Sequence, residues 1–280
     1  MDSRFVAHRR DDFLSKIRVY VAGATGNVGR HIVKALISAV DMEVVGGWAR
    51  RDTWDLGEMV GLPELGIKTS NDLRGSLRAA AADVVVDFTS PSVVMDNLRV
   101  YADLRLDAVI GTTGFSEEQL AQAREWAKEG QLRWAIGANF CLSMNLALGF
   151  MKKVRPQYPY VTIIEKYSAQ KADAPSGTSL WLARELATGE AGEVLSKELL
   201  PGAFGGDLGG VQIHSVRLPT PAFHGEHEII MARQDEALTI KVTEYSSGIF
   251  NDAVLTTVRK IGLLPAGSVI TSLAELPGDL

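Results

Sequence analysis

Over roughly the first half of the chain, short apolar runs alternate with amphipathic segments. Four apolar runs have the length of buried strands: Ile17–Ala22, Glu43–Trp48, Ala82–Phe88 and Asp107–Ile110. The segments that follow these runs carry apolar residues at helical spacing, and the one over Ser116–Lys128 begins with a capping serine and acidic residues. Alternation of strands and helices predicts an α/β fold whose parallel sheet is doubly wound, with helices on both faces.

The pattern changes after about residue 139. From Tyr160 onward several segments alternate apolar and polar residues, as strands do when one face of their sheet is covered: Val161–Glu165, Val211–Arg217, His227–Met231 and Ala237–Thr243. This predicts a central α+β domain with a mostly β sheet. A helix over about Phe250–Ile261 and the following tail are expected to return to the first domain. The expected domains are therefore 1–138 with 250–280, and 139–249.

A glycine-rich turn follows the first predicted strand. It reads Gly23-Ala24-Thr25-Gly26-Asn27-Val28-Gly29 and precedes a helical segment. In this context the first glycine makes the tight bend, the second lets the backbone approach a pyrophosphate, and the third permits close packing of helix on strand. The N–H groups of the helix start then face the phosphates. The turn therefore predicts a Rossmann-type dinucleotide site in the N-terminal domain.

The end of the second predicted strand indicates which nicotinamide cofactor binds. An acidic residue there would bind the ribose 2′-hydroxyl of NADH, but this chain has Arg50 and Arg51. Guanidinium groups pair well with a 2′-phosphate, so NADPH is the expected cofactor. Asp52 follows, and NADH remains a possible second cofactor. Thr89 and the run Gly111-Thr112-Thr113 follow the third and fourth strands, where they would line the nicotinamide side.

Composition excludes several other classes of protein. The chain has 280 residues, 46% hydrophobic and 22% charged, as in a soluble globular protein of two domains. A net charge of −5 argues against a nucleic-acid partner. The lone Cys141 excludes an intramolecular disulfide and fits a cytoplasmic location. No apolar run is long enough to span a membrane, and His224 and His227 lack a third ligand for a metal site.

The stretch from Lys171 to Thr178 reads Lys-Ala-Asp-Ala-Pro-Ser-Gly-Thr and has the features of an anion site. Lys171 supplies a positive charge, and Pro175 pre-sets the entry to a helix. The backbone N–H groups of Gly177 and Thr178 would then face outward at the helix start. A nicotinamide cofactor beside a carboxylate site predicts hydride transfer to a small acidic substrate.

Taken in order, these motifs resemble those of the 4-hydroxy-tetrahydrodipicolinate reductase family, NAD(P)H-dependent oxidoreductases of lysine and diaminopimelate biosynthesis that reduce a cyclic imine dicarboxylate. The resemblance rests on Gly23–Arg30, Asp87–Thr89, Gly111–Phe115, Ala138–Phe140 with Asn145, Asp173–Thr178 and Gly225–His227. It implies a homotetramer assembled through the substrate-domain sheets, with a small-molecule carboxylate as substrate. The expected cofactor contacts are Gly23, Ala24, Thr25, Gly26, Asn27, Val28, Arg50, Arg51, Thr89, Gly111, Thr112, Thr113, Ala138, Asn139 and Phe140.

The substrate side departs from the family's pattern. The resemblance makes Lys171 the proton donor and carboxylate partner, with Gly177 and Thr178 as the carboxylate-binding backbone. The family's histidine pair is replaced by Tyr167 and Ser168, and a family arginine is replaced around 246–247. The expected catalytic residues are therefore Lys171 and Tyr167, and the expected substrate contacts are Ser168, Lys171, Gly177 and Thr178.

These departures leave other functions open. The chain could reduce a different imine or ketone with Tyr167 and Lys171, or it could be a non-catalytic NADP-binding sensor. The spacing Tyr167 to Lys171 also matches short-chain dehydrogenases, but Asp173–Pro175 would break the long helix that carries this pair in them. A further cation near Gly177–Thr178, such as Arg217, would favour a dicarboxylate, whereas an apolar lining would favour another substrate.

Overall fold

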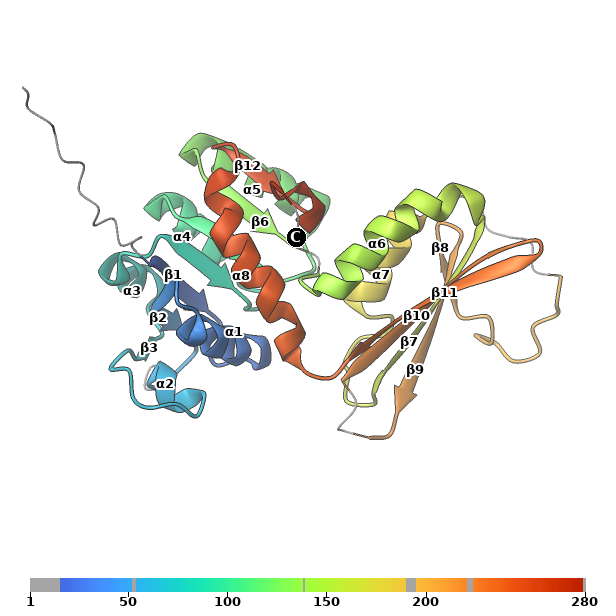
Figure 1. The fold of residues 1–280 in the computed structure, drawn as a ribbon, viewed down its shortest axis with the longest axis horizontal. Helices are drawn as coiled ribbons and strands as arrows, with labels where there is room; N and C mark the ends of the chain where they lie inside the picture. Colours follow the sequence, from blue (N-terminus) through green and yellow to red (C-terminus); the bar gives the residue numbers. More distant parts are fainter. Residues whose placement is uncertain (1–15, 52–53, 138, 190–194, 221–223, 279–280) are drawn as a thin grey trace, which may run out of the picture.

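The computed structural model describes residues 16–51, 54–137, 139–189, 195–220 and 224–278. Its two sheets lie in separate parts of the molecule, and the chain passes between these parts after residue 136 and again after residue 244 (Figure 1). No helix within these ranges is both long enough and apolar enough to cross a membrane.

The first sheet has seven parallel strands in the order β12-β6-β5-β4-β1-β2-β3. Its strands are β1 (Ile17–Ala22), β2 (Met42–Trp48), β3 (Thr69–Ser70), β4 (Val84–Asp87), β5 (Asp107–Ile110), β6 (Arg133–Ile136) and β12 (Ser268–Ile270). The chain first runs outward from β1 to β3 and then from β4 to β12 in the opposite direction. The predicted Rossmann-type doubly wound sheet is therefore confirmed.

Helices cover both faces of this sheet because its strands are apolar on both sides. One core lies under α1 (Asn27–Ser38) and α8 (Asn251–Lys260), and the other lies under α3 (Leu73–Ala80), α4 (Val94–Leu104) and α5 (Glu117–Gly130). Ser116 and Gln119 form a reciprocal capping box at the start of α5. A short α2 (Leu56–Met59) follows β2, and short 3₁₀ turns lie at 155–157, 247–250, 261–263 and 273–275.

The second sheet is mixed, with five strands in the order β11-β10-β7-β9-β8. They are β7 (Tyr160–Ser168), β8 (Gly206–Leu208), β9 (Val211–Leu218), β10 (Gly225–Arg233) and β11 (Glu236–Glu244). Only the pair β7 and β9 is parallel. Helices α6 (Leu142–Val154) and α7 (Gly177–Leu186) pack over one face and bury a common apolar core. The predicted mostly β second sheet is present.

Burial alternates along β7, as the sequence pattern predicts. Val161, Ile163, Glu165 and Tyr167 face α6 and α7 and are buried, whereas Thr162, Ile164 and Lys166 are only half-buried. Polar side chains on the other face pair across strands, with Glu226 between Lys166 and Lys241 at 2.7 and 2.8 Å. No described segment of the chain covers that face.

Candidate active site

The strand order of the first sheet reverses between β1 and β4, and ligands of such sheets bind at the carboxyl ends of the strands there. The turn after β1 lies against the loop after β4. Gly23 has φ +82°, and a Cβ atom at this residue would lie 2.3 Å from the carbonyl oxygen of Phe88. A Cβ at Gly29 would lie 2.1 Å from the carbonyl oxygen of Gly23. The close packing of this turn therefore requires both glycines.

The same turn leads directly into α1. Gly26 is the N-cap of the helix and has no side chain that could bond to the first turn, so the N–H groups at Asn27 and Val28 can meet an external anion. Thr25 accepts a hydrogen bond from Arg30 Nε at 3.1 Å through its backbone carbonyl. The arrangement fits the pyrophosphate of a dinucleotide.

A buried carboxylate fixes the neighbouring loops. Asp87 ends β4, has no exposed surface, and accepts hydrogen bonds from the Thr89 N–H at 3.0 Å and hydroxyl at 2.7 Å. It also accepts from the hydroxyl of Thr112 at 3.1 Å and that of Tyr101 at 2.7 Å. Burial and this carboxylate together raise the pKa of Tyr101 well above its usual value. Asp87 thereby positions Thr89 and Thr112 at the edge where a nicotinamide ring would lie.

The other expected cofactor residues are spread around this edge. Arg50 and Arg51 are exposed after β2. Gly111 is half-buried, and Phe88 packs directly against its backbone. Thr113 is exposed in the same loop. Two expectations, at Asp52 and Ala138, lie outside the described residues.

The loop after β6 joins this edge to the second sheet. Phe140 is buried with its ring centroid 5.8 Å from that of Phe88. Asn139 donates from Nδ2 to the hydroxyl of Thr178 at 3.1 Å. A Cβ at Gly177 would lie 3.9 Å from the hydroxyl of Thr113. The first residues of α7 therefore sit against the loops at the carboxyl ends of β5 and β6, where the sequence places the nicotinamide.

The stretch from Lys171 to Thr178 leads into α7, and the helix begins within it, as the sequence predicted. Ser176 is the N-cap and accepts a hydrogen bond from the Ser179 N–H at 3.2 Å, and Gly177 is the first helical residue. Lys171 forms an ion pair with Asp173, whose carboxylate lies close enough to the Gly177 N–H for that group to affect its pKa. Partial burial opposes ionisation of Asp173, but the bonds from Lys171 and Gly177 outweigh it and lower the pKa of this carboxyl.

A second, fully buried carboxylate accepts hydrogen bonds from the first residues of α7. Glu165 has no exposed surface and accepts from the Ser176 N–H at 2.9 Å and the Ser179 hydroxyl at 2.6 Å. It also forms an ion pair with Arg217 at 2.7 Å. Burial alone would raise the pKa of Glu165, but these hydrogen bonds lower it to about 2. Arg217 also donates to the carbonyl oxygen of Asp173 at 2.6 Å, so it belongs to the same cluster.

Both cations of this cluster lie over the ring of Tyr167. Lys171 Nζ is 5.3 Å and Arg217 Cζ is 5.5 Å from the centroid of its ring. The side chain is buried, and burial followed by the charge of Glu244 raises the pKa of its phenol well above the usual value. Such a phenol is a weak acid at neutral pH. The geometry favours Tyr167 as a cation–π platform rather than as a proton donor.

Ser168 uses its polar groups locally. Its hydroxyl accepts the Gln170 N–H at 3.2 Å, and its carbonyl oxygen accepts the Lys171 N–H at 3.0 Å. Ser168 is also buried, with 9% of its surface exposed. It therefore shapes the turn that carries Lys171.

His227 and Glu244 also lie close to Tyr167. His227 is fully buried on β10, and burial lowers its pKa to about 4, so it is neutral at neutral pH. Its Nδ1 lies 3.8 Å from Glu244 Oε1. Burial raises the pKa of Glu244, although the charge of Lys171 opposes this shift. Of the two cations in this cluster, Lys171 has the more exposed side chain, at 32% against 19% for Arg217. A ligand can therefore reach Lys171 from solvent, and Lys171 lies over the ring of Tyr167 at the same time.

Sequence reasoning assigned no role to several of these residues: Glu165, Asp173, Glu244 and His227. A signal was present for two of them. Glu165 occupies an inward position in the alternation of β7, and an inward carboxylate requires partners. Asp173 lies two residues after Lys171 in the same motif. Glu244 and His227 meet only because β10 and β11 pair, which the sequence does not specify.

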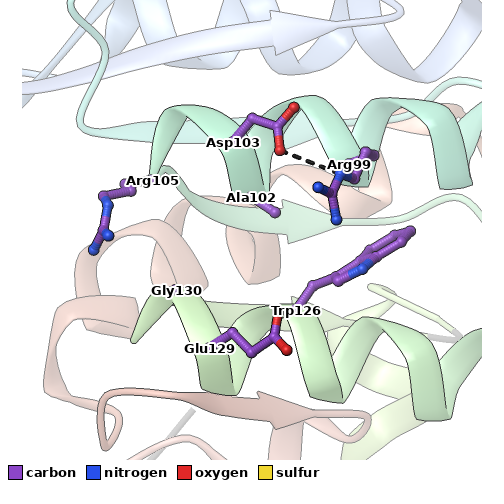
Figure 2. Close-up of a pocket in the computed structure, with 7 residues that line it drawn as sticks. All are labelled: Arg99, Ala102, Asp103, Arg105, Trp126, Glu129 and Gly130. Carbon is purple, nitrogen blue, oxygen red and sulfur yellow. Dashed lines mark ion pairs between the residues drawn. The ribbon is translucent and has the colours of Figure 1, made fainter.

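A separate surface cavity of about 260 Å³ lies between α4 and α5. Figure 2 shows Arg99 beside Trp126, with Asp103 above them. The guanidinium carbon of Arg99 is 5.5 Å from the Trp126 ring centroid, and Arg99 pairs with Asp103 at 3.2 Å. Because Arg105 and Gly130 end the two helices, this cavity lies away from the carboxyl ends of the strands. It is not part of the site described above.

Comparison with known proteins identifies two adjacent family models. Residues 17–140 match the dihydrodipicolinate reductase N-terminus, and residues 139–273 match the dihydrodipicolinate reductase C-terminus. The chain is 34% identical over 257 residues to the 4-hydroxy-tetrahydrodipicolinate reductase of Desulfitobacterium hafniense, covering 90% of this chain and 96% of that protein. It is 38% identical over 258 residues to the enzyme of the same name from Synechococcus elongatus, covering 88% and 93%.

One solved structure matches nearly the whole fold. It is the dipicolinate-bound dihydrodipicolinate reductase from Paenisporosarcina sp. TG-14, with a TM-score of 0.77 and 28% identity. The match covers 92% of this chain and 98% of that one. The agreement therefore extends over both sheets.

Proposed function

The chain belongs to the dihydrodipicolinate reductase family, and we propose that it reduces 4-hydroxy-tetrahydrodipicolinate to tetrahydrodipicolinate with a nicotinamide cofactor. The observation that carries this proposal is the position of α7. Thr178 accepts a hydrogen bond from Asn139 at the carboxyl edge of the first sheet, and a Cβ at Gly177 would lie 3.9 Å from the hydroxyl of Thr113 there. A carboxylate bound there would lie next to a nicotinamide bound at that edge.

We further propose that the unit of 1–138 and 250–280 binds the cofactor and that 139–249 binds the substrate. The glycine turn from Gly23 to Val28 would hold the pyrophosphate, and Thr89 and Gly111–Thr113 would face the nicotinamide, with Ala138–Phe140 beside them. Arg50 and Arg51 would pair with the 2′-phosphate of NADPH, which makes it the preferred cofactor over NADH.

The chemistry divides between cofactor and protein. The bound nicotinamide supplies a hydride to a substrate carbon, and the conversion also releases the 4-hydroxyl group as water. The ammonium group of Lys171 is the proton donor, and it also attracts the substrate carboxylate. The Gly177 and Thr178 N–H groups orient that carboxylate at the positive end of α7. Tyr167 holds Lys171 over the site through its ring face.

The activity is tested with purified protein, NADPH and freshly generated 4-hydroxy-tetrahydrodipicolinate, by following oxidation of NADPH. Wild-type protein should turn over the substrate, and Lys171→Met should lose about 10²-fold or more in kcat while still binding NADPH. NADPH binding without any turnover by the wild type would defeat the assignment. Comparison of NADPH with NADH, in wild type and in Arg51→Ala, tests the cofactor preference.

The alternative functions have less support. Reduction of another imine or ketone by Tyr167 would need an acidic phenol, whereas burial raises the pKa of this one. Tyr167→Phe keeps the ring and removes the hydroxyl, so it should leave kcat within a few-fold of wild type. A large loss of kcat with unchanged cofactor affinity would restore Tyr167 as the acid. A cofactor sensor without activity would show no turnover of any imine or ketone tested.

We also propose a homotetramer that covers the bare face of the second sheet. Tyr160 is 52% and Val216 37% exposed, and Ile164 lies half-buried between polar neighbours. Apolar side chains on a sheet face that the described chain leaves open fit burial against another copy. Sedimentation of the wild-type protein should give a tetramer, and Ile164→Arg should shift it to smaller species. A monomeric wild type would contradict the proposal.

A further inference from the structure

We propose that Asp173 occupies the substrate-carboxylate position in the ligand-free protein and that a bound carboxylate displaces it. This inference rests on the proposed function of the α7 start as a carboxylate site. Asp173 is then a residue that sets affinity and selectivity, because it competes with the ligand from within the chain.

The contacts of Asp173 are those expected of a bound anion. Its carboxylate pairs with the ammonium group of Lys171, and it lies close enough to the N–H of Gly177 for that group to lower its pKa. These are the side chain and the backbone group to which the proposed function assigns the substrate carboxylate. The carbonyl oxygen of Asp173 accepts from Arg217 at 2.6 Å, which holds the residue's backbone close to the second cation.

Exposure distinguishes Asp173 from the other carboxylate at the helix start. Glu165 is fully buried and has three donors, so it cannot leave without stranding a buried charge. The side chain of Asp173 is 51% exposed and that of Lys171 is 32% exposed. Asp173 lies on the segment between β7 and α7, from which its carboxylate can rotate into water. Glu165 therefore stays bonded to the start of α7, whereas Asp173 can leave Lys171 when a ligand carboxylate binds.

Displacement has a consequence for selectivity. A ligand carboxylate restores the charge pairing that Lys171 loses when Asp173 leaves, whereas a neutral carbonyl group does not. The internal carboxylate therefore excludes uncharged ligands more strongly than carboxylates. Removal of its charge leaves Lys171 and the positive end of α7 open to any anion.

The experiment measures binding of pyridine-2,6-dicarboxylate (dipicolinate) by calorimetry, with NADPH present, to wild type, Asp173→Asn and Asp173→Ala. Both variants should bind the ligand about tenfold more tightly, and Asp173→Ala more tightly than Asp173→Asn, because asparagine still places an uncharged acceptor oxygen beside Lys171. Chloride and phosphate should also compete more effectively in the variants.

Asp41→Asn is the matched control. Asp41 is an exposed aspartate paired with Arg259 at 2.7 Å, remote from the site, and its substitution should leave dipicolinate affinity unchanged. Thermal melting of all variants verifies the fold. Unchanged or weaker binding in both Asp173 variants, with the fold intact, would overturn the inference.

The binding readout separates this inference from the proposed function. If the variants bind dipicolinate more weakly while wild-type protein reduces 4-hydroxy-tetrahydrodipicolinate, the inference fails and the function stands. If they bind it more tightly while wild type shows no turnover, the inference stands and the function fails. Lys171→Met should lose dipicolinate binding whether or not Asp173 is present.

Discussion

Glu165 and Asp173 show how burial assigns different roles to two carboxylates beside one helix. Both have pKa values below the ordinary value, because both accept hydrogen bonds and pair with a cation. Only Glu165 is completely removed from water. It therefore contributes to stability, and its loss should be measurable as a free energy of unfolding.

Glu165→Gln should destabilise the protein by about 3 kcal/mol, since it leaves the largely buried Arg217 without its ionic partner. Urea unfolding of the variant measures this loss. Glu228→Gln, on the open face of the same sheet, should change stability by no more than about 0.5 kcal/mol. Equal effects of the two substitutions would contradict a structural role specific to Glu165.

Acid should destabilise the fold in two consecutive ranges. Burial lowers the pKa of His227 from 6.5 to about 4, so the unfolded chain binds more protons between these values and stability falls as pH drops through them. Glu165 has a pKa lowered from 4.5 to about 2, and its contribution is lost as pH falls across that range. Glu244, whose pKa burial raises, acts in the opposite direction.

His227→Gln tests the upper range. Between about pH 7 and about pH 5, wild-type protein should lose unfolding free energy, and the variant should lose clearly less. Urea unfolding at the two pH values measures the difference. A decline of the same size in both proteins would assign the effect to other groups.

At the scale of elements, two turns that lead into helices bring the candidate site together. The turn before α1 depends on glycine for steric reasons, and the turn before α7 depends on Ser176, which caps the helix and is itself held by Glu165. Both helices present positive ends to the same edge of the first sheet. The identity of the residues at each turn therefore decides whether an anion can approach.

Gly29→Ala should impair cofactor binding by at least tenfold, because the new Cβ would lie 2.1 Å from the carbonyl oxygen of Gly23 and displace the turn. Fluorescence titration with NADPH measures this. Gly149→Ala is the control: Gly149 is exposed within α6 and a Cβ there would meet no atom within 4 Å. That variant should bind NADPH normally and gain up to about 1 kcal/mol in stability.

At the scale of the whole molecule, the candidate site depends on how the two sheets are placed. The hydrogen bond between Asn139 and Thr178 connects them at the site. Phe250 packs into the cores of both units where the chain returns to the first sheet. If the two units bind cofactor and substrate as proposed, a cofactor bound to one unit can therefore influence a ligand bound to the other.

Thr178→Val keeps the shape of the side chain and removes the hydroxyl that accepts from Asn139. NADPH should then enhance dipicolinate binding about fivefold less than in wild type, while NADPH affinity alone stays unchanged. Calorimetry with and without NADPH measures the coupling. An unchanged enhancement would show that this hydrogen bond does not link the two sites.

Much of the fold follows from patterns in the sequence. The strands Ile17–Ala22 and Asp107–Ile110 were predicted with the bounds that the structure has. The apolar pattern and the length of each run can be seen within a few neighbouring residues. The capping box at Ser116 and the helix that begins at Gly177 likewise depend on neighbours within a few residues. The predicted strand Val161–Glu165 was too short, because the ladder with β9 and β10 extends it to Ser168.

The sequence by itself determined the glycine-rich turn before α1, the alternation of strands and helices, and the helix start after Lys171, since each depends on residues close together in the chain. Only the tertiary structure decided the environment of Tyr167 and brought Arg217, His227 and Glu244 close to it. Strand pairing joins residues that are tens of positions apart, and their burial and pKa values depend on those neighbours. The long-range contacts therefore define the chemistry of the substrate side, while the local pattern defines the cofactor side.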